Sequence, residues 1–222
     1  MFMLSIKNLS KSFLQGGLVL NGLSLEVNEG DSIAIMGPSG SGKTTLLNII
    51  GLLDKPDSGE IFFKGIPIAR FTDKESAAYR SRNVGFIFQD HLLLPHLTVS
   101  ENIFFPLLAS EYNKNELSER EAYLKMLMEK TGIMDLKDKY PFHISGGEAQ
   151  RVAVVRSLAN NPSILLADEP TGSLDARNAE NLAKLLTEMN REFGITIILA
   201  THSADLAKNM SKILRLDDGK LS

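Results

Sequence analysis

The chain has 222 residues, of which 43% are hydrophobic and 23% charged, so it can bury one sizeable core. Its formal net charge of -3 gives no support for nucleic-acid binding, and the absence of cysteine rules out disulfides and thiolate metal sites. The N-terminal segment lacks the long apolar stretch of a secretory signal. No run approaches the roughly 18 apolar residues of a membrane-spanning helix, so we expect that this chain does not cross a membrane by itself.

The first part of the chain has the pattern of β-strands. Residues 3 to 35 alternate apolar and polar side chains, with a turn signal at Gly16-Gly17. Residues 58–68 predict a further strand–turn–strand unit, and residues 84–89 predict a short strand that ends at a polar residue. These segments make the N-terminal part of the chain β-rich.

The middle of the chain changes to helical periodicity. Residues 99 to 139 contain two helical patterns, and Ser118 followed by Glu121 predicts a capping box at the start of the second helix. Beyond residue 145 helices alternate with apolar strands, and the chain ends in a strand and a hairpin. This order predicts an α/β core that is split by a helical insertion at roughly residues 90–160.

A phosphate-binding loop is the strongest local motif. The stretch GPSGSGKT fits G-x-x-x-x-G-K-[ST], with a buried strand pattern before it and a helical pattern after it. Lys43 supplies a positive charge for the β- and γ-phosphates, and the Thr44 hydroxyl can reach Mg²⁺. The residues expected at the nucleotide are Gly37, Pro38, Ser39, Gly40, Ser41, Gly42, Lys43, Thr44 and Thr45. A purely structural glycine-rich loop is the alternative, and the full match in this context disfavours it.

Two acids follow another apolar strand pattern. Residues 163–170 read SILLADEP, so a buried strand would end at Asp168 beside the phosphate loop, where an α/β sheet binds its ligand. Asp168 would hold Mg²⁺, directly or through water, and Glu169 would point elsewhere and polarise an attacking water. A strand end with two solvated acids is the ordinary alternative, which the phosphate loop makes the weaker one.

A second possible anion cradle lies at Ser145-Gly146-Gly147, before a helix predicted over residues 148–159. Ser145 is a candidate N-cap, and a helix N-terminus offers N–H groups and a favourable dipole to an anion. A glycine-rich helix entry is the structural alternative. One nucleotide does not need two cradles on one chain, so the phosphate loop and the acids leave this stretch unexplained.

With this stretch the chain resembles the ATP-binding subunits of ABC transporters, over nearly its whole length. Ser145, Gly146, Gly147 and Glu148 resemble the signature motif of that family. The resemblance implies that the signature of one subunit completes the ATP site of a second copy in a head-to-tail dimer. A dimer of this kind would account for the second cradle.

Further residues match functional positions of the family. Gln89 resembles the Q-loop glutamine, which the resemblance implies to contact Mg²⁺ near the membrane partner. Asp175 resembles the D-loop aspartate, and His202 the switch histidine that contacts the γ-phosphate. Phe13 stands where an aromatic residue stacks on adenine. One departure is Ala149, which lies beside the signature cradle where the family usually has a polar or charged residue.

The resemblance also implies an architecture of the α/β class, with one ABC ATPase domain over residues 1–222. A P-loop NTPase core with a parallel sheet and an N-terminal antiparallel β subdomain would comprise about 1–90 and 160–222. An inserted helical signature subdomain would comprise about 91–159.

Within the family, FIFQDHLLLPHLTVSENIFFPLL and ADEPTGSLDARNAENLAKLL resemble the group that contains LolD, MacB and FtsE. This resemblance favours lipoprotein release, with a MacB-like exporter or an FtsE-like regulatory ATPase as alternatives. It implies ATP and Mg²⁺ as cofactors and transmembrane permease subunits as partners. It also implies a peripheral location at the cytoplasmic face of the inner membrane. The apolar segment from residue 90 to about 108 would leave an exposed groove for a helix of that partner.

Two rivals come from other classes. Soluble ABC-type ATPases of DNA repair or translation have a long coiled coil or two ATPase domains in one chain, and the sequence has neither feature. A regulatory protein that binds nucleotide without turnover would not need Glu169 and His202.

Overall fold

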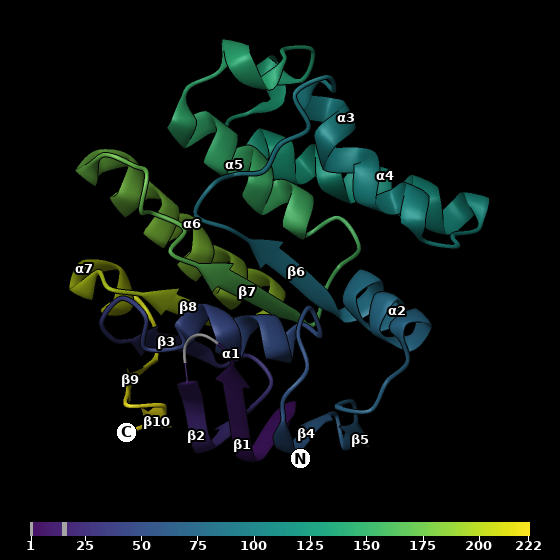
Figure 1. Ribbon diagram of the computed structural model, residues 1–222. Coiled ribbons are helices and arrows are strands. Elements are labelled where there is room, and N and C mark those ends of the chain that lie inside the picture. Colours follow the sequence, from purple (N-terminus) through teal and green to yellow (C-terminus); the bar gives the residue numbers. More distant parts are fainter. Residues whose placement is uncertain (1, 15–16) are drawn as a thin grey trace.

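The computed structural model describes residues 2–14 and 17–222 and contains two β-sheets, with the smaller sheet at the lower edge of Figure 1 and most helices above it. The smaller sheet has the strand order β2-β1-β4-β5, and all its strand pairs are antiparallel. Its strands are β1 (Leu4–Phe13), β2 (Gly17–Val27), β4 (Ser58–Phe63) and β5 (Ile66–Pro67). The β-rich N-terminal region is therefore confirmed. Of the predicted turn at Gly16-Gly17, Gly17 begins β2 and Gly16 lies outside the described residues.

The larger sheet has the strand order β10-β9-β3-β8-β7-β6. Its strands are β3 (Ser32–Met36), β6 (Val84–Ile87), β7 (Ile164–Asp168), β8 (Thr196–Thr201), β9 (Lys212–Asp217) and β10 (Lys220–Leu221). Every pair is parallel except that of β9 with β10. Because parallel strands share one carboxyl edge, the segments that follow β3, β7 and β8 meet at that edge.

Two hydrophobic cores lie on the two faces of the larger sheet. Ile33 and Ile35 of β3 pack in a core with the smaller sheet and with α1 (Lys43–Ile50). Ala34 belongs to the other core, because successive side chains of a strand point to opposite faces. In Figure 1, α1 lies between the two sheets. Helix α1, which follows the phosphate loop, therefore packs against both sheets.

The second core joins the larger sheet to a layer of helices, drawn in teal and green at the top of Figure 1. The layer contains α3 (Val99–Phe104), η1 (Phe105–Ala109), α4 (Lys114–Lys130), η2 (Met134–Leu136), η3 (Pro141–His143) and α5 (Gly146–Ser157). Later in the chain come α6 (Ala176–Phe193) and α7 (Ala204–Ala207). Among the described residues, none of the helices combines the length and hydrophobicity that crossing a bilayer requires.

The start of α4 differs from the sequence prediction. The helix begins at Lys114, and the side chain of Asn113 accepts a hydrogen bond from the backbone N–H of Glu116 at 3.0 Å. Glu116 Oε2 in turn accepts a hydrogen bond from the backbone N–H of Asn113 at 2.9 Å, which completes the capping box. The predicted box at Ser118 and Glu121 is therefore wrong, because the helix is capped five residues earlier and Ser118 lies inside it.

Two other helices also differ from expectation. The helix after the signature stretch begins at Gly146 and ends at Ser157, rather than covering residues 148–159, while Ser145 is its N-cap as predicted. Helix α2 (Asp73–Asn83) has no counterpart in the sequence prediction. Its start does carry a recognisable signal, a capping box between Thr72 and Glu75.

Candidate functional site

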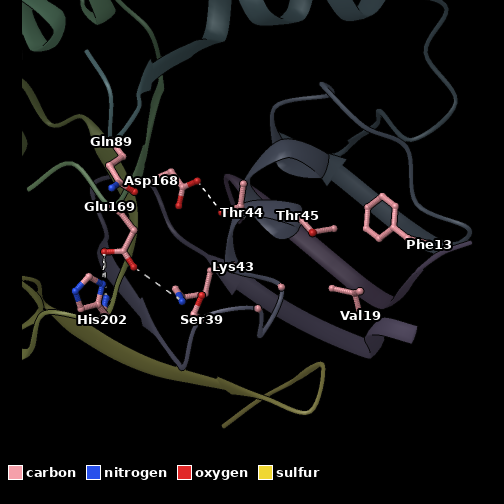
Figure 2. A pocket seen from close by; sticks show the side chains of 12 residues that line it. Phe13, Val19, Ser39, Lys43, Thr44, Thr45, Gln89, Asp168, Glu169 and His202 are labelled. Atoms are coloured by element: carbon pink, nitrogen blue, oxygen red, sulfur yellow. Dashed lines mark hydrogen bonds and ion pairs between the residues drawn. The ribbon is translucent and has the colours of Figure 1, made fainter. Parts of the chain in front are cut away.

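A cavity of about 740 Å³ opens at the carboxyl edge of the larger sheet (Figure 2). Its lining residues are Phe13, Val19, Ser39, Gly40, Gly42, Lys43, Thr44, Thr45, Gln89, Asp168, Glu169 and His202. All of them except Val19 are predicted site residues. The sheet topology brings these residues together from segments far apart in the chain. The phosphate loop and the acids Asp168 and Glu169 lie side by side, as the sequence predicts.

The phosphate loop connects β3 to α1. Gly42 has a φ of 102°, and a Cβ there would lie 2.9 Å from Val19 Cγ1, so only glycine fits this turn. In the described chain, α1 begins without a side-chain N-cap. The N-caps of the other described α-helices are Thr72, Thr98, Asn113, Ser145, Asp175 and Ser203. The first-turn N–H groups of α1 are therefore available to an anion in the cavity.

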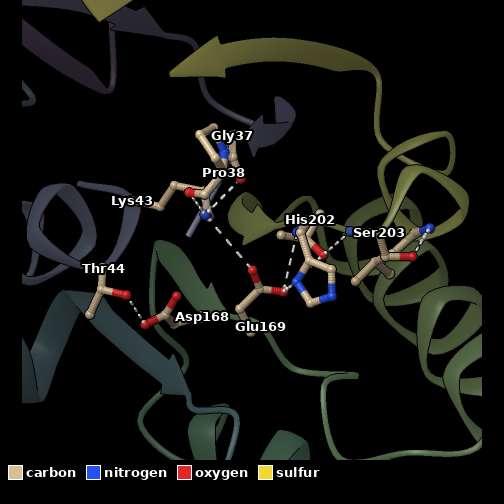
Figure 3. Close-up of polar contacts among 10 residues, drawn as sticks. Gly37, Pro38, Lys43, Thr44, Asp168, Glu169, His202 and Ser203 are labelled. Carbon is tan, nitrogen blue, oxygen red and sulfur yellow. Dashed lines mark hydrogen bonds and ion pairs between the residues drawn. The ribbon is translucent and has the colours of Figure 1, made fainter. Parts of the chain in front are cut away.

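Lys43 provides the positive charge of this loop. The residue is 7% exposed, and its Nζ donates to the carbonyl oxygens of Gly37 at 2.9 Å and Pro38 at 3.0 Å. The same Nζ lies 4.0 Å from Glu169 Oε1 (Figure 3). Gly37, Pro38 and Ser41 form the turn behind Lys43 rather than the cavity wall. The two carbonyl groups hold the ammonium in the centre of the site, where a phosphate would pair with it.

Asp168 lies at the end of β7, opposite the start of α1. Its Oδ2 accepts a hydrogen bond from Thr44 Oγ1 at 2.7 Å, across 124 positions of the chain. Its Oδ1 is buried and has no hydrogen-bond partner among the described residues. Burial raises the pKa of Asp168, and the hydrogen bond from Thr44 opposes that rise. A buried carboxylate oxygen without a partner, next to a hydroxyl, suits a hard divalent cation.

Glu169 turns away from Asp168, as its predicted separate role requires. Its φ of 45° is left-handed, and its Oε2 lies 2.9 Å from His202 Nδ1 (Figure 3). The same oxygen accepts hydrogen bonds from Thr201 Oγ1 at 3.2 Å and from the backbone N–H of His202 at 3.3 Å. The Glu169 side chain is 16% exposed, whereas that of His202 is 71% exposed. The carboxylate is therefore fixed in orientation while one oxygen remains near Lys43.

The loop that carries Gln89 is attached to helix α5. Gln150 Nε2 donates to the carbonyl oxygen of the residue before Gln89 at 3.0 Å. On the other side of Gln89, Arg156 donates to the carbonyl oxygens of His91 at 2.7 Å and Leu92 at 2.6 Å. Leu92 is held there with a left-handed φ of 48°. Helix α5, which begins at the signature residue Gly146, thus holds the Gln89 loop by hydrogen bonds on both sides of Gln89.

The aromatic end of the cavity is formed by the smaller sheet. Phe13 ends β1 and is 44% exposed, and Val19 of β2 lies near it (Figure 2). Val19 is a site residue that the sequence did not indicate. Its position depends on the pairing of β1 with β2, so no local motif could have found it.

The predicted signature residues Ser145-Gly146-Gly147 do not line this cavity, and neither does Asp175. Ser145 caps α5, and both its N–H and its hydroxyl donate to Glu148 Oε2 at 2.7 Å. Asp175 caps α6. Ala149 is 1% exposed and packs in the core, so its methyl group cannot contact a partner surface. Within one chain, the structure therefore keeps the two predicted cradles apart.

Fold and site together define a class of protein. A parallel sheet carries at its carboxyl edge a phosphate loop, a buried lysine, a threonine–aspartate pair and an oriented glutamate. This is the arrangement of P-loop proteins that bind nucleoside triphosphates.

Comparison with known proteins narrows the class. The family model described as ABC transporter matches residues 20–172. The lipoprotein-releasing system ATP-binding protein LolD of Syntrophus aciditrophicus is 43% identical over 222 residues, which cover 99% of this chain and 98% of LolD. The LolD protein of Bacteroides thetaiotaomicron is 42% identical over 220 residues and 99% of each chain.

Solved structures show the same relationship. A dimeric post-hydrolysis state of the ATP-binding cassette MJ0796, bound to ADP and Pi, has a TM-score of 0.85 at 37% identity and covers 99% of this chain and 97% of its own. CbiO1 from Clostridium perfringens has a TM-score of 0.88 at 31% identity and covers 100% of this chain and 87% of its own. The chain belongs to the ABC transporter family, as an ATP-binding subunit with ATPase activity.

Proposed function

We propose that this subunit hydrolyses ATP to power the release of lipoproteins from the inner membrane through a permease partner. The observation that carries the proposal is the identity of 43% to a LolD protein across 99% of this chain. The cavity supports the ATPase part of the proposal, because it collects a phosphate loop, a metal-binding pair and a general-base candidate.

ATP would bind with its triphosphate in the phosphate loop. The N–H groups of α1 would donate hydrogen bonds to the phosphates, and the Lys43 ammonium would neutralise part of their charge. Phe13 would stack on the adenine. Thr44, Asp168 and Gln89 would hold Mg²⁺, since each offers an oxygen and the unpaired Asp168 Oδ1 needs a partner. The cation would neutralise the charge that develops on the phosphate oxygens.

Glu169 is the proposed general base. Its carboxylate accepts a proton from the attacking water while the water oxygen bonds to the γ-phosphorus and the bond to ADP breaks. His202 keeps the carboxylate in place through the 2.9 Å contact and can reach the γ-phosphate with its exposed ring. Lys43 stabilises the charge on the transferring group.

The signature residues would serve a second copy of the chain. Ser145-Gly146-Gly147 cannot close the cavity of its own chain, but a head-to-tail dimer would bring it to the γ-phosphate of the partner subunit. An incoming phosphate would replace the Glu148 carboxylate as the acceptor of the Ser145 hydroxyl. Asp175 lies at the start of α6 and would contact the partner as well. The structures of the related MJ0796 cassette are dimeric, which supports the dimer on which this arrangement depends.

The helical part, about 91–159, would face the permease at the cytoplasmic side of the inner membrane, with 1–90 and 160–222 forming the catalytic core. The apolar segment after Gln89 divides as expected, because Leu93 is 7% exposed whereas Leu92 and Leu108 are 57% and 83% exposed. A groove of about 400 Å³ beside it is lined in part by Phe86, Leu92 and Pro106. A helix of the permease would fit this surface. The hydrogen bond from Arg156 to the carbonyl oxygen of Leu92 would connect the surface to the loop that carries Gln89.

A complex reconstituted in proteoliposomes with the permease that copurifies with this chain tests the proposal. ATP should drive the release of a lipoprotein from proteoliposomes. Leu108→Asp should abolish release but leave the ATPase activity of the isolated subunit unchanged, whereas Ile213→Asp, at a 50% exposed position of β9, should affect neither. A complex that hydrolyses ATP and releases no lipoprotein would refute this cargo and leave the ATPase assignment intact.

A further inference from the structure

Lys11 lies behind the aromatic residue of the cavity. Its Nζ is placed over the Phe13 ring, 5.1 Å from the ring centroid, which is the geometry of a cation–π contact. The Lys11 side chain is 12% exposed and does not line the cavity, whereas Phe13 is 44% exposed and does. Lys11 therefore covers one face of the ring and leaves ring surface open to the cavity.

The turn that follows α1 holds Lys11 in place. Its Nζ donates to Asp54 Oδ1 at 2.8 Å and to the carbonyl oxygen of Lys55 at 2.6 Å. The backbone of the same strand end is tied to this turn as well, because Ser12 N donates to Asp57 Oδ2 at 2.7 Å. The end of β1 is thus attached to the segment that follows α1, the helix that begins in the phosphate loop.

We propose that Lys11 is a positioning residue for adenine: it orders the Phe13 ring before the base arrives. The proposal rests on the proposed stacking of adenine on Phe13. A half-exposed phenyl ring without support would lose rotamer freedom on binding, which weakens affinity by roughly three- to tenfold. The partners of Lys11, Asp54 and Lys55, follow α1 directly, and α1 begins in the phosphate loop. Lys11 would therefore also hold the Phe13 ring at a set distance from the phosphate loop.

The same strand supplies a matched control. Lys7 Nζ lies over the Phe62 ring, 5.5 Å from its centroid, and neither residue lines the cavity. Lys7→Met removes a cation–π contact from the same strand but away from the cavity. A loss of ATP affinity in Lys11→Met that is absent in Lys7→Met is therefore not a general effect of losing a lysine on β1.

Calorimetry with ATP and with inorganic tripolyphosphate, both with Mg²⁺, tests the proposal. Lys11→Met should weaken ATP binding about three- to tenfold and leave tripolyphosphate binding within about twofold. Lys7→Met should change neither affinity. Phe13→Ala should weaken ATP binding, and Lys11→Met should add no further loss in that background, because the two residues act together. Lys11→Arg keeps the cation and should retain ATP affinity within about twofold.

The outcomes separate this proposal from the proposed function. If Phe13→Ala weakens ATP binding and Lys11→Met does not, the role of Lys11 is refuted and the adenine site stands. If Phe13→Ala has no effect, the adenine site and the proposal both fail. Equal losses of ATP and tripolyphosphate affinity in Lys11→Met would mean that Lys11 acts on the phosphate loop instead. If that variant does not fold, Asp54→Ala removes the carboxylate that accepts a hydrogen bond from the Lys11 ammonium; an unchanged ATP affinity then overturns the proposal.

Discussion

Replacement of Glu169 by glutamine tests the hydrolytic part of the site. Glutamine keeps an acceptor oxygen for Thr201 Oγ1 and for the backbone N–H of His202, but it cannot take a proton from water. Loss of a general base costs roughly 10²–10⁴-fold in rate, or about 2.7–5.4 kcal/mol of barrier at 1.36 kcal/mol per decade. We expect the upper half of that range, because the carboxylate is only 16% exposed and bulk water has little access to replace it.

ATP binding should survive this substitution. Glu169 Oε1 lies 4.0 Å from Lys43 Nζ, so the change removes a negative charge from the neighbourhood of the triphosphate and leaves the ammonium in place. Steady-state phosphate release measures turnover, and calorimetry measures binding. Glu188→Gln, at an exposed position of α6, is the matched control and should behave as wild type. Turnover of Glu169→Gln within twofold of wild type would show that another group is the base.

Three further predictions concern binding, assembly and pH. Lys43→Ala should abolish ATP binding in a calorimetric titration, because the loop loses its ammonium; undiminished affinity would contradict the phosphate-loop assignment. In sedimentation with ATP, Glu169→Gln should be a dimer, and an added Ser145→Arg should return it to a monomer that still binds ATP. Equal dimerisation of both would exclude the signature from the shared site. Hydrogen bonds from the backbone and side chain of Thr98 lower the pKa of Glu101 from its usual 4.5. The ionised Glu101 therefore stabilises the start of α3 fully above pH 4.5, and this stabilisation is lost as the pH falls through the lower pKa of the folded state. The difference in free energy of unfolding between wild type and Glu101→Gln should therefore shrink between about pH 7 and about pH 3 in urea titrations, and a constant difference would refute this linkage.

Features that depend on neighbouring residues were predictable. The strand before the phosphate loop, the N-cap at Ser145 and the strand that ends at Asp168 are each encoded within a few positions, and the structure contains all three. The predicted helix start at Ser118 failed because local chemistry offers several cap candidates there without ranking them. Asn113 is the one that bonds two backbone N–H groups.

By itself, the sequence determined which residues are chemically equipped for triphosphate binding and hydrolysis, since a phosphate loop and a strand-end acid pair are short motifs. The tertiary structure alone decided their geometry. It placed Thr44 against Asp168, turned Glu169 toward His202 and set Lys11 behind Phe13. Contacts of this kind depend on strand order, on side-chain packing and, at Glu169, on a left-handed backbone, which are properties of the assembled sheets that no local stretch of sequence encodes.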